Sequence, residues 1–232
     1  MGKDKLKKWA EIESFRHVIQ PGFDEIFRKD YILKGNWSKN QFQNQNPIVL
    51  ELGCGKGEYT IGLARNFPDK NFIGVDIKGA RIWRGAKTAK EEGLLNVCFL
   101  RTRIEFIESF FDKNEIEEIW LTFPDPQLKK NRIKKRLSGA LFLNSYRSFL
   151  KQDGSIHLKT DNQELYHYSL ALLEMNKLPV LNATSDLYSG VLPNEFLSTK
   201  TYYEEKFLSQ GIKITYLQFQ LTGNKKIKEL GI

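Results

Sequence analysis

The chain has 232 residues, of which 41% are hydrophobic, and it carries a net charge of +8 with an isoelectric point near 9.3. No apolar run has the length of a transmembrane helix, the start MGKDKLKKWAEIE lacks the apolar core of a secretory signal, and two cysteines are too few for a disulfide framework. These features argue against a membrane protein, a disulfide-rich secreted protein and a metal site, and they favour a cytoplasmic protein with a polyanionic partner.

The first 46 residues differ in character from the rest of the chain. They are basic and polar, rich in Lys, Asn and Gln, with scattered aromatic residues and little periodicity. We interpret residues 1–46 as a basic N-terminal arm, partly packed and partly mobile. A single domain is expected over residues 47–232.

From Pro47 onward, short apolar runs alternate with helix-like stretches. The runs IVLEL, NFIGVD, VCFL, EIWLTF and SIHLKT are almost continuously apolar, as strands covered on both faces should be. The helices expected between and after them are Glu58–Asn66, Gly79–Glu92, Ile104–Phe111, Leu137–Leu150 and Gln163–Met175. This alternation predicts an α/β fold with a mostly parallel sheet flanked by helices.

After Asn176 the rhythm changes. We expect a strand near Val180–Ala183, a helix at Lys200–Ser209 and a final strand in the alternating segment IKITYLQFQL. An antiparallel C-terminal pair at the edge of the sheet would fit this ending.

A glycine loop, LELGCGKGEYT, joins the first predicted strand to the first predicted helix. Gly53, Gly55 and Gly57 permit positive φ and close approach of a ligand to the backbone. Glu51 would repel a pyrophosphate but attract a cation, and Asp76, which ends the next strand, could bind a ribose diol. This combination favours S-adenosylmethionine. The alternatives are a plain strand-to-helix turn with Asp76 as a helix cap, or a Rossmann oxidoreductase, for which the chain has no second domain.

The segment LTFPDPQLKKNRIKKR follows the fourth predicted strand, at the carboxyl edge of the sheet where ligands of α/β proteins bind. Its two prolines fix Asp125 in place, either as a rigid acceptor beside the transferred methyl group or as a solvated turn residue. The basic run after it would contact a phosphate backbone or form a solvated face. It contains Lys129, Lys130, Arg132, Lys134, Lys135 and Arg136.

Together these motifs resemble the bacterial tRNA (guanine-N7-)-methyltransferases, which are class I methyltransferases with a Rossmann-like fold. The resemblance runs from about Pro47 to the C-terminal strand. It rests on ELGCGKG, NFIGVDIKGAR, LTFPDPQLKKNRIKKRL, LFLNSY, HLKTDNQELY and TYYEEKF. It implies methyl transfer from S-adenosylmethionine to N7 of the variable-loop guanine, position 46, of tRNA, with residues 47–232 as the methyltransferase domain.

The resemblance also implies roles for individual residues, with Asp125 as the catalytic one. The cofactor-binding residues would be Glu51, Gly53, Gly55, Gly57, Asp76, Arg103 and Asp125. The substrate-binding residues would be Lys129, Asp161, Thr201, Tyr202, Tyr203 and Glu204.

Two positions depart from the family pattern. Gln127 stands where the family has Trp, and Arg103 stands where it has an acidic or amide residue near the adenine.

Helix capping would equally explain Asp161, with Glu164 three residues on, and Thr201. Two other functions stay open: a class I methyltransferase acting on another RNA or a small molecule, and an RNA-binding relative without catalysis.

Overall fold

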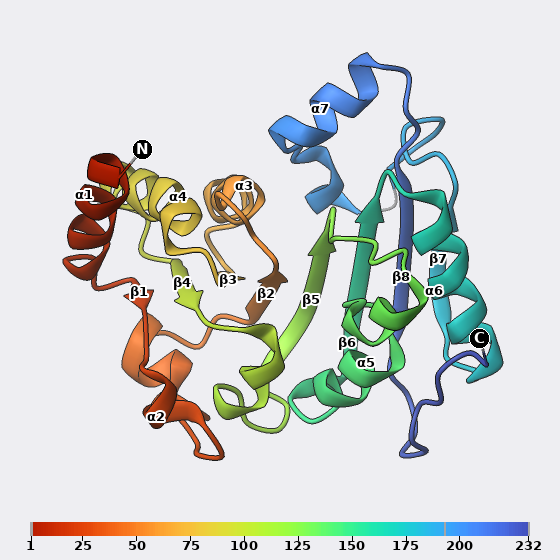
Figure 1. Cartoon of the computed structure of the whole chain (residues 1–232), viewed down its shortest axis with the longest axis horizontal. Coiled ribbons are helices and arrows are strands. Elements are labelled where there is room, and N and C mark those ends of the chain that lie inside the picture. The colour runs from red at the N-terminus through yellow and green to blue at the C-terminus, as the bar shows by residue number, and fades with distance from the viewer. Residues whose placement is uncertain (1, 193, 232) are drawn as a thin grey trace.

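The structure, a computed structural model, describes residues 2–192 and 194–231. Within these residues an eight-stranded sheet carries helices on both faces (Figure 1). From one edge to the other its strands are β1 (Val18–Ile19), β4 (Val97–Arg101), β3 (Asn71–Asp76), β2 (Ile48–Leu52), β5 (Ile116–Thr122), β6 (Leu150–Thr160), β8 (Thr215–Gln220) and β7 (Val180–Thr184).

All neighbours from β1 to β6 are parallel, whereas β8 runs antiparallel to both β6 and β7. The predicted α/β class, the mostly parallel sheet and the antiparallel C-terminal strands are confirmed. After β2 the chain adds β3 and β4 on one side and then β5 and β6 on the other. Strand order therefore reverses between β2 and β5, and such a switch point is where open α/β sheets bind ligands at their carboxyl edge.

The helices form two layers. On one face lie α1 (Gly2–Glu13), α3 (Glu58–Asn66) and α4 (Gly79–Glu92), and on the other α5 (Ala140–Tyr146) and α6 (Gln163–Met175). The remaining helical segments are α2 (Phe23–Ile26), a π-helix at Trp37–Phe42, α7 (Tyr202–Ser209) and 3-10 turns at Ile104–Ser109, Lys130–Lys135 and Glu195–Ser198. In Figure 1, α7 lies beyond the tips of β5 and β6.

Three predicted helices, now α3, α4 and α6, have the bounds expected from the sequence. Two predictions need correction. The segment expected as a helix from Ile104 is a 3-10 turn that ends at Ser109, and the next helix starts only at Ala140, after Gly139 as its N-cap. That helix ends at Tyr146 because Leu150 already pairs with Ile116 as the first residue of β6.

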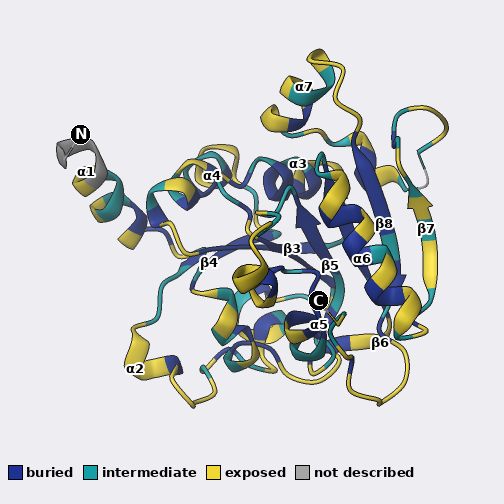
Figure 2. Ribbon diagram, turned by 45° about the vertical axis from the view of Figure 1, so that its right-hand side comes forward, coloured by how far each residue is buried: buried dark blue, intermediate teal, exposed yellow. Residues whose placement is uncertain are grey.

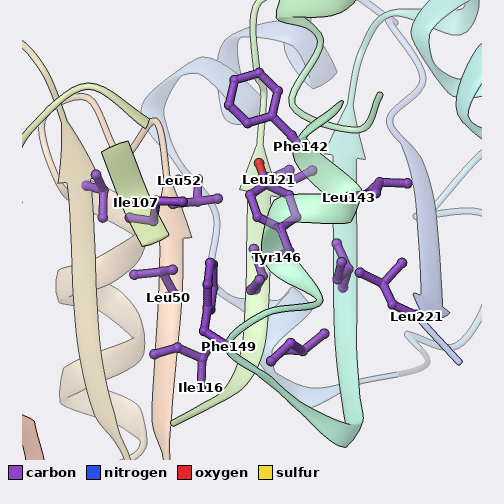
Figure 3. Packing of buried hydrophobic residues seen from close by; sticks show 14 of the residues in the cluster. Leu50, Leu52, Ile107, Ile116, Leu121, Phe142, Leu143, Tyr146, Phe149 and Leu221 are labelled. Atoms are coloured by element: carbon purple, nitrogen blue, oxygen red, sulfur yellow. The ribbon is translucent and has the colours of Figure 1, made fainter. Parts of the chain in front are cut away.

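The core beneath α5 is aromatic. Figure 3 shows Tyr146 and Phe149 over Leu50 and Leu121 of the central strands. All four side chains are fully buried, and each apolar side chain of this size contributes about 1.5–3 kcal/mol when buried. This packing holds α5 against β2 and β5, the two strands at the switch point.

The N-terminal residues that the structure describes contact the main body. Val18 pairs with Phe99 to extend the sheet, and the Trp83 indole donates to the Glu11 carboxylate of α1. Trp37 is fully buried, and its indole donates to the Phe110 carbonyl at 2.7 Å. The boundary at residue 47 and the partial mobility of residues 1–46 stay predictions.

Burial follows the position of each strand in the sheet. Figure 2 shows β3 and β5 in the buried colour, while β7 at the edge is largely exposed. Within residues 2–192 and 194–231, no helix combines the length and the apolarity needed to cross a membrane.

Candidate functional site

The glycine loop after β2 has the backbone that its sequence predicts. Gly53, Gly55 and Gly57 have φ of 83°, 57° and 74°, in the region that favours glycine. A Cβ at Gly57 would lie 2.6 Å from the Phe99 ring, so no larger residue fits there. A Cβ at Gly55 would meet no atom within 4 Å. The loop is therefore closely packed at one glycine and open to a ligand at another.

Asp76, at the end of β3, ties this loop to the neighbouring strand. Its Oδ2 accepts from the Gly55 N–H at 3.0 Å, and its Oδ1 accepts from the Lys78 N–H at 2.7 Å. The N-cap of α4 is Lys78, so Asp76 is not the helix cap that the plain-turn alternative required. The carboxylate is thus fixed at the rim of the glycine loop.

Glu51, inside the sheet, is held by hydrogen bonds. Its side chain is only 5% exposed and accepts from the Thr60 N–H at 3.0 Å and from the hydroxyls of Thr60 and Thr122. Burial raises the pKa of the Glu51 carboxyl, the hydrogen bonds from the two threonines lower it, and the charge of Asp76 raises it further. The group is positioned by β2, α3 and β5 together.

Two cavities meet over this loop. The main cleft has a volume of 590 Å³ and the inner pocket a volume of 130 Å³, and both are lined by Gly53, Arg81 and Phe123. Of the other predicted site residues, the main cleft adds Asp76, Arg103 and Asp125. The inner pocket adds Glu51, Gly55, Thr201 and Tyr203. Segments far apart in the sequence therefore converge on one connected space.

The loop that carries Asp125 is constrained at both ends. Phe123 and Gln127 have φ of 49° and 47°, a conformation that costs a non-glycine residue on the order of 1–3 kcal/mol and that clusters at functional sites. The Phe123 N–H donates to the Lys159 carbonyl at 2.8 Å, and the Gln127 N–H donates to Asp125 Oδ1 at 3.0 Å. Asp125 itself is exposed at the main cleft.

Arg136, the last residue of the basic run, is buried and does not face the solvent. Arg136 is only 3% exposed, and its Nε donates to the Pro126 carbonyl at 3.0 Å. Its guanidinium lies 4.2 Å from the Tyr168 ring centroid and 3.3 Å from a Glu164 carboxylate oxygen. The expectation that the whole run contacts phosphate is wrong for Arg136, because this residue is buried beneath the Asp125 loop.

The other basic residues of the run are solvent-facing. The 3-10 turn at Lys130–Lys135 buries Ile133 and leaves the charged side chains outside. Lys135 also lines the main cleft, whereas Lys129 lines neither cavity. Exposed are Lys129, Lys130, Arg132, Lys134 and Lys135.

The TYYE segment begins α7. Thr201 is its N-cap and forms a capping box with Glu204, which confirms the capping interpretation. The Glu204 side chain is fully buried, accepts from the Tyr188 hydroxyl and forms an ion pair with Lys159 at 2.8 Å. It therefore lines neither cavity, in contrast to Thr201 and to Tyr203, which line the inner pocket.

Replacing Glu204 by Gln should destabilise the protein. Burial lowers the pKa of the Lys159 ammonium and Glu204 opposes that shift, so the variant leaves a buried cation without its counter-ion. We expect the free energy of unfolding to fall by about 2–3 kcal/mol. Urea unfolding would measure this loss. Pairing the variant with Lys159→Met should restore part of the stability, and strictly additive losses would contradict the coupling.

Asp161 follows β6 at the same edge of the sheet as Asp125, because Lys159 pairs with Thr122. It does not cap α6. The N-cap is Asn162, whose side chain accepts from the Leu165 N–H at 2.8 Å, so the capping explanation for Asp161 is wrong by one residue. Asp161 lines neither cavity, and its substrate-binding role stays a prediction.

Comparison with known proteins identifies the family. A family model described as "Putative methyltransferase" matches residues 45–217. A tRNA (guanine-N(7)-)-methyltransferase of Christiangramia forsetii is 54% identical over 94% of this chain and 98% of its own length. One of Bacteroides thetaiotaomicron is 50% identical over 99% of this chain and 90% of its own. The chain belongs to the tRNA (guanine-N7-)-methyltransferase family.

Solved structures support the fold of this family member. The structure of an antibiotic-related methyltransferase covers 84% of this chain and 97% of its own, with a TM-score of 0.60 and 18% identity. The 16S rRNA methyltransferase KamB covers 82% of this chain and 95% of its own, with a TM-score of 0.60 and 13% identity. The predicted class I methyltransferase architecture is confirmed.

The fold and the family imply S-adenosylmethionine as the methyl donor. The residues present fit that molecule. Open space lies over Gly55, and the adjoining cleft carries the Asp76 carboxylate, a partner for ribose hydroxyls. No group of His, Cys, Asp and Glu that could hold a metal ion occurs in the described part of the chain.

Sequence reasoning missed Arg81. This exposed residue lies in the first turn of α4 and lines both cavities, and no ion pair involves it among the residues described. It stood within the segment NFIGVDIKGAR that carried the family resemblance. Its position three residues into a helix that starts at the cofactor edge was the available signal, because such a guanidinium suits a carboxylate or a phosphate.

Proposed function

We propose that this protein transfers a methyl group from S-adenosylmethionine to N7 of the variable-loop guanine, position 46, of tRNA. The observation that carries the proposal is the placement of Asp125 on the main cleft, beside the glycine loop and Asp76. Relatives with the matching activity name, at 54% and 50% identity over nearly the whole chain, support it. tRNA as the partner and the cytoplasm as the location follow from this proposal.

Within it, the chain's own residues bind and orient the two reactants. Asp76 would hold the ribose of the donor, Glu51 would favour its positive charge, and Arg103 would stand near the adenine, through its backbone amide or its side chain. S-adenosylmethionine, when bound, supplies an electrophilic methyl group. Gly53, Gly55 and the neighbouring backbone would cradle its amino acid moiety.

Guanine N7 has an in-plane lone pair and needs no general base. The protein's task is then to position the base, and orienting two reactants can contribute on the order of 7–11 kcal/mol. Asp125 and Asp161 would accept hydrogen bonds from the N1 and N2 edge of guanine and offset charge arriving on the ring. Lys129 would contact the RNA backbone, and Thr201 and Tyr203 would bound the base from the side of α7, with Tyr202 beside them. Glu204, which is fully buried, would hold the start of α7 and would not touch the base.

The doubly substituted variant Lys129→Ala/Lys130→Ala should bind tRNA more weakly. Both side chains are exposed on the face next to the cleft, and each lost phosphate contact should reduce the slope of log affinity against log salt by about 1. Binding isotherms at several salt concentrations would measure this slope. An unchanged slope would mean that the run is only a solvated face.

The proposal itself is tested by tritiated methyl transfer from S-adenosylmethionine to unmodified bulk tRNA, followed by nucleoside analysis. A 7-methylguanosine product that disappears when the variable-loop guanine is replaced would support the substrate, the atom and the position. Transfer to another RNA or to a small molecule, with no competition from bulk tRNA, would favour the alternative methyltransferase. Donor binding by calorimetry without transfer to any substrate would favour a non-catalytic relative.

A further inference from the structure

A third cavity opens on the outer side of the glycine loop. This outer groove has a volume of 450 Å³ and lies between α3, α4 and the segment that leads into α7. Its lining includes Lys56 from the glycine loop, Arg84 from α4, and Lys200 and Tyr202 beside α7. None of these four residues has a role in the proposed reaction, apart from Tyr202.

The outer groove carries positive charge that the described residues do not neutralise. Lys56, Arg84 and Lys200 are exposed, and none of them forms an ion pair in the part of the chain that the structure describes. The Arg84 guanidinium donates to the Thr88 hydroxyl at 3.1 Å. The Lys200 ammonium lies 4.6 Å from the Tyr188 ring centroid.

Two carboxylates and a fourth cation also line the groove, but neither carboxylate forms an ion pair with Lys56, Arg84 or Lys200 among the described residues. The Glu58 carboxylate accepts from the Tyr202 N–H at 2.9 Å, and Arg65 forms an ion pair with Glu92 at 2.5 Å. Glu205 is exposed and forms no ion pair among the described residues. The groove therefore keeps an excess of cationic side chains.

The outer groove adjoins the functional site. It shares Lys56 and Glu58 with the inner pocket, and the inner pocket shares Gly53 and Phe123 with the main cleft. The main cleft is bounded in turn by Lys135 of the basic run. The three cavities thus adjoin one another in series, with exposed cationic side chains at both ends.

We propose that the outer groove binds the phosphate backbone of the substrate RNA on the side of the target nucleotide opposite the basic run. This proposal rests on the proposed function. An RNA strand whose base enters the cleft continues on both sides of that nucleotide, and the basic run can neutralise the backbone phosphates on only one side. Lys56, Arg84 and Lys200 supply sequence-independent affinity for the other, and Tyr202, 61% exposed, offers an aromatic face to a neighbouring base.

The test is the double variant Arg84→Gln/Lys200→Gln, which removes two charges and leaves the glycine loop intact. tRNA affinity should fall roughly 10-fold at 0.1 M salt, and the salt slope should decrease by about 2. The KM for tRNA should rise while kcat at saturating tRNA and the affinity for S-adenosylmethionine stay at the wild-type values.

The matched control is Lys39→Gln/Lys113→Gln, which removes the same charge away from the groove. Lys39 lies in the π-helix Trp37–Phe42, and Lys113 lies before the amino end of β5. Both residues are exposed. This control should keep wild-type affinity and slope. Equal losses in both variants, or no loss in the groove variant while the wild type binds and methylates tRNA, would overturn the proposal. A wild-type chain that neither binds nor methylates tRNA would instead overturn the proposed function, and with it the ligand assigned to the groove.

Discussion

Replacing Asp125 by Ala is expected to lower turnover on the order of 100- to 1,000-fold at saturating tRNA, while the dissociation constant for tRNA stays near the wild-type value. The reason is the separation of two tasks in the structure. The carboxylate lies at the main cleft and accepts from the Gln127 N–H at 3.0 Å, whereas the exposed Lys129, Lys130 and Lys134 do not line the cleft. Losing the carboxylate should therefore affect the reacting base more than the backbone contacts.

Single-turnover methyl transfer and tRNA binding, measured on the same preparations, would separate these effects. Asp125→Asn is the informative companion, because its amide oxygen can still accept from the Gln127 N–H and keep the turn. If Asn behaves like Ala, the carboxylate charge matters. If Asn behaves like the wild type, the shape of the loop is sufficient. Wild-type turnover in the Ala variant would remove Asp125 from the mechanism.

The parts of this fold that depend on local pattern could be predicted from the sequence. Buried parallel strands are nearly continuous in apolar residues. α3 and α4 lie between such strands and α6 follows one, so the bounds of these helices are clear. The strand β1 could not be predicted in this way. It has two residues, Val18 and Ile19, and it is defined only by its pairing with β4.

The site predictions divide in the same way, between those that depend on local sequence and those that depend on tertiary contacts. The positive φ angles of Gly53, Gly55 and Gly57 could be predicted because glycine is the residue that adopts them without strain. Whether a charged residue is exposed depends instead on tertiary contacts that the sequence does not show. Glu204 and Arg136 look like surface charges in the sequence, yet each is buried by partners distant along the chain, namely Lys159 and Tyr168.

Replacing Arg136 by Gln is expected to lower kcat on the order of 100-fold with little change in tRNA affinity or its salt slope. The Arg136 Nε holds the Pro126 carbonyl, next to Asp125, and the guanidinium is itself held over Tyr168, whose hydroxyl donates to Glu229 at 2.6 Å. Removing it frees the loop, and a misplacement of about 1 Å can cost 100-fold in rate. Arg136 is thus a positioning residue for Asp125.

Exposed Lys134, two residues earlier, provides the matched control. Lys134→Gln should weaken tRNA binding and reduce the salt slope by about 1 while leaving kcat unchanged. Arg136→Lys, which keeps a donor for the Pro126 carbonyl, should recover part of kcat, whereas a general loss of packing would not be rescued in this way. All rates should be taken well below each variant's melting temperature. If Arg136→Gln instead loses salt slope and keeps kcat, Arg136 contacts RNA and the buried arrangement does not describe the enzyme at work.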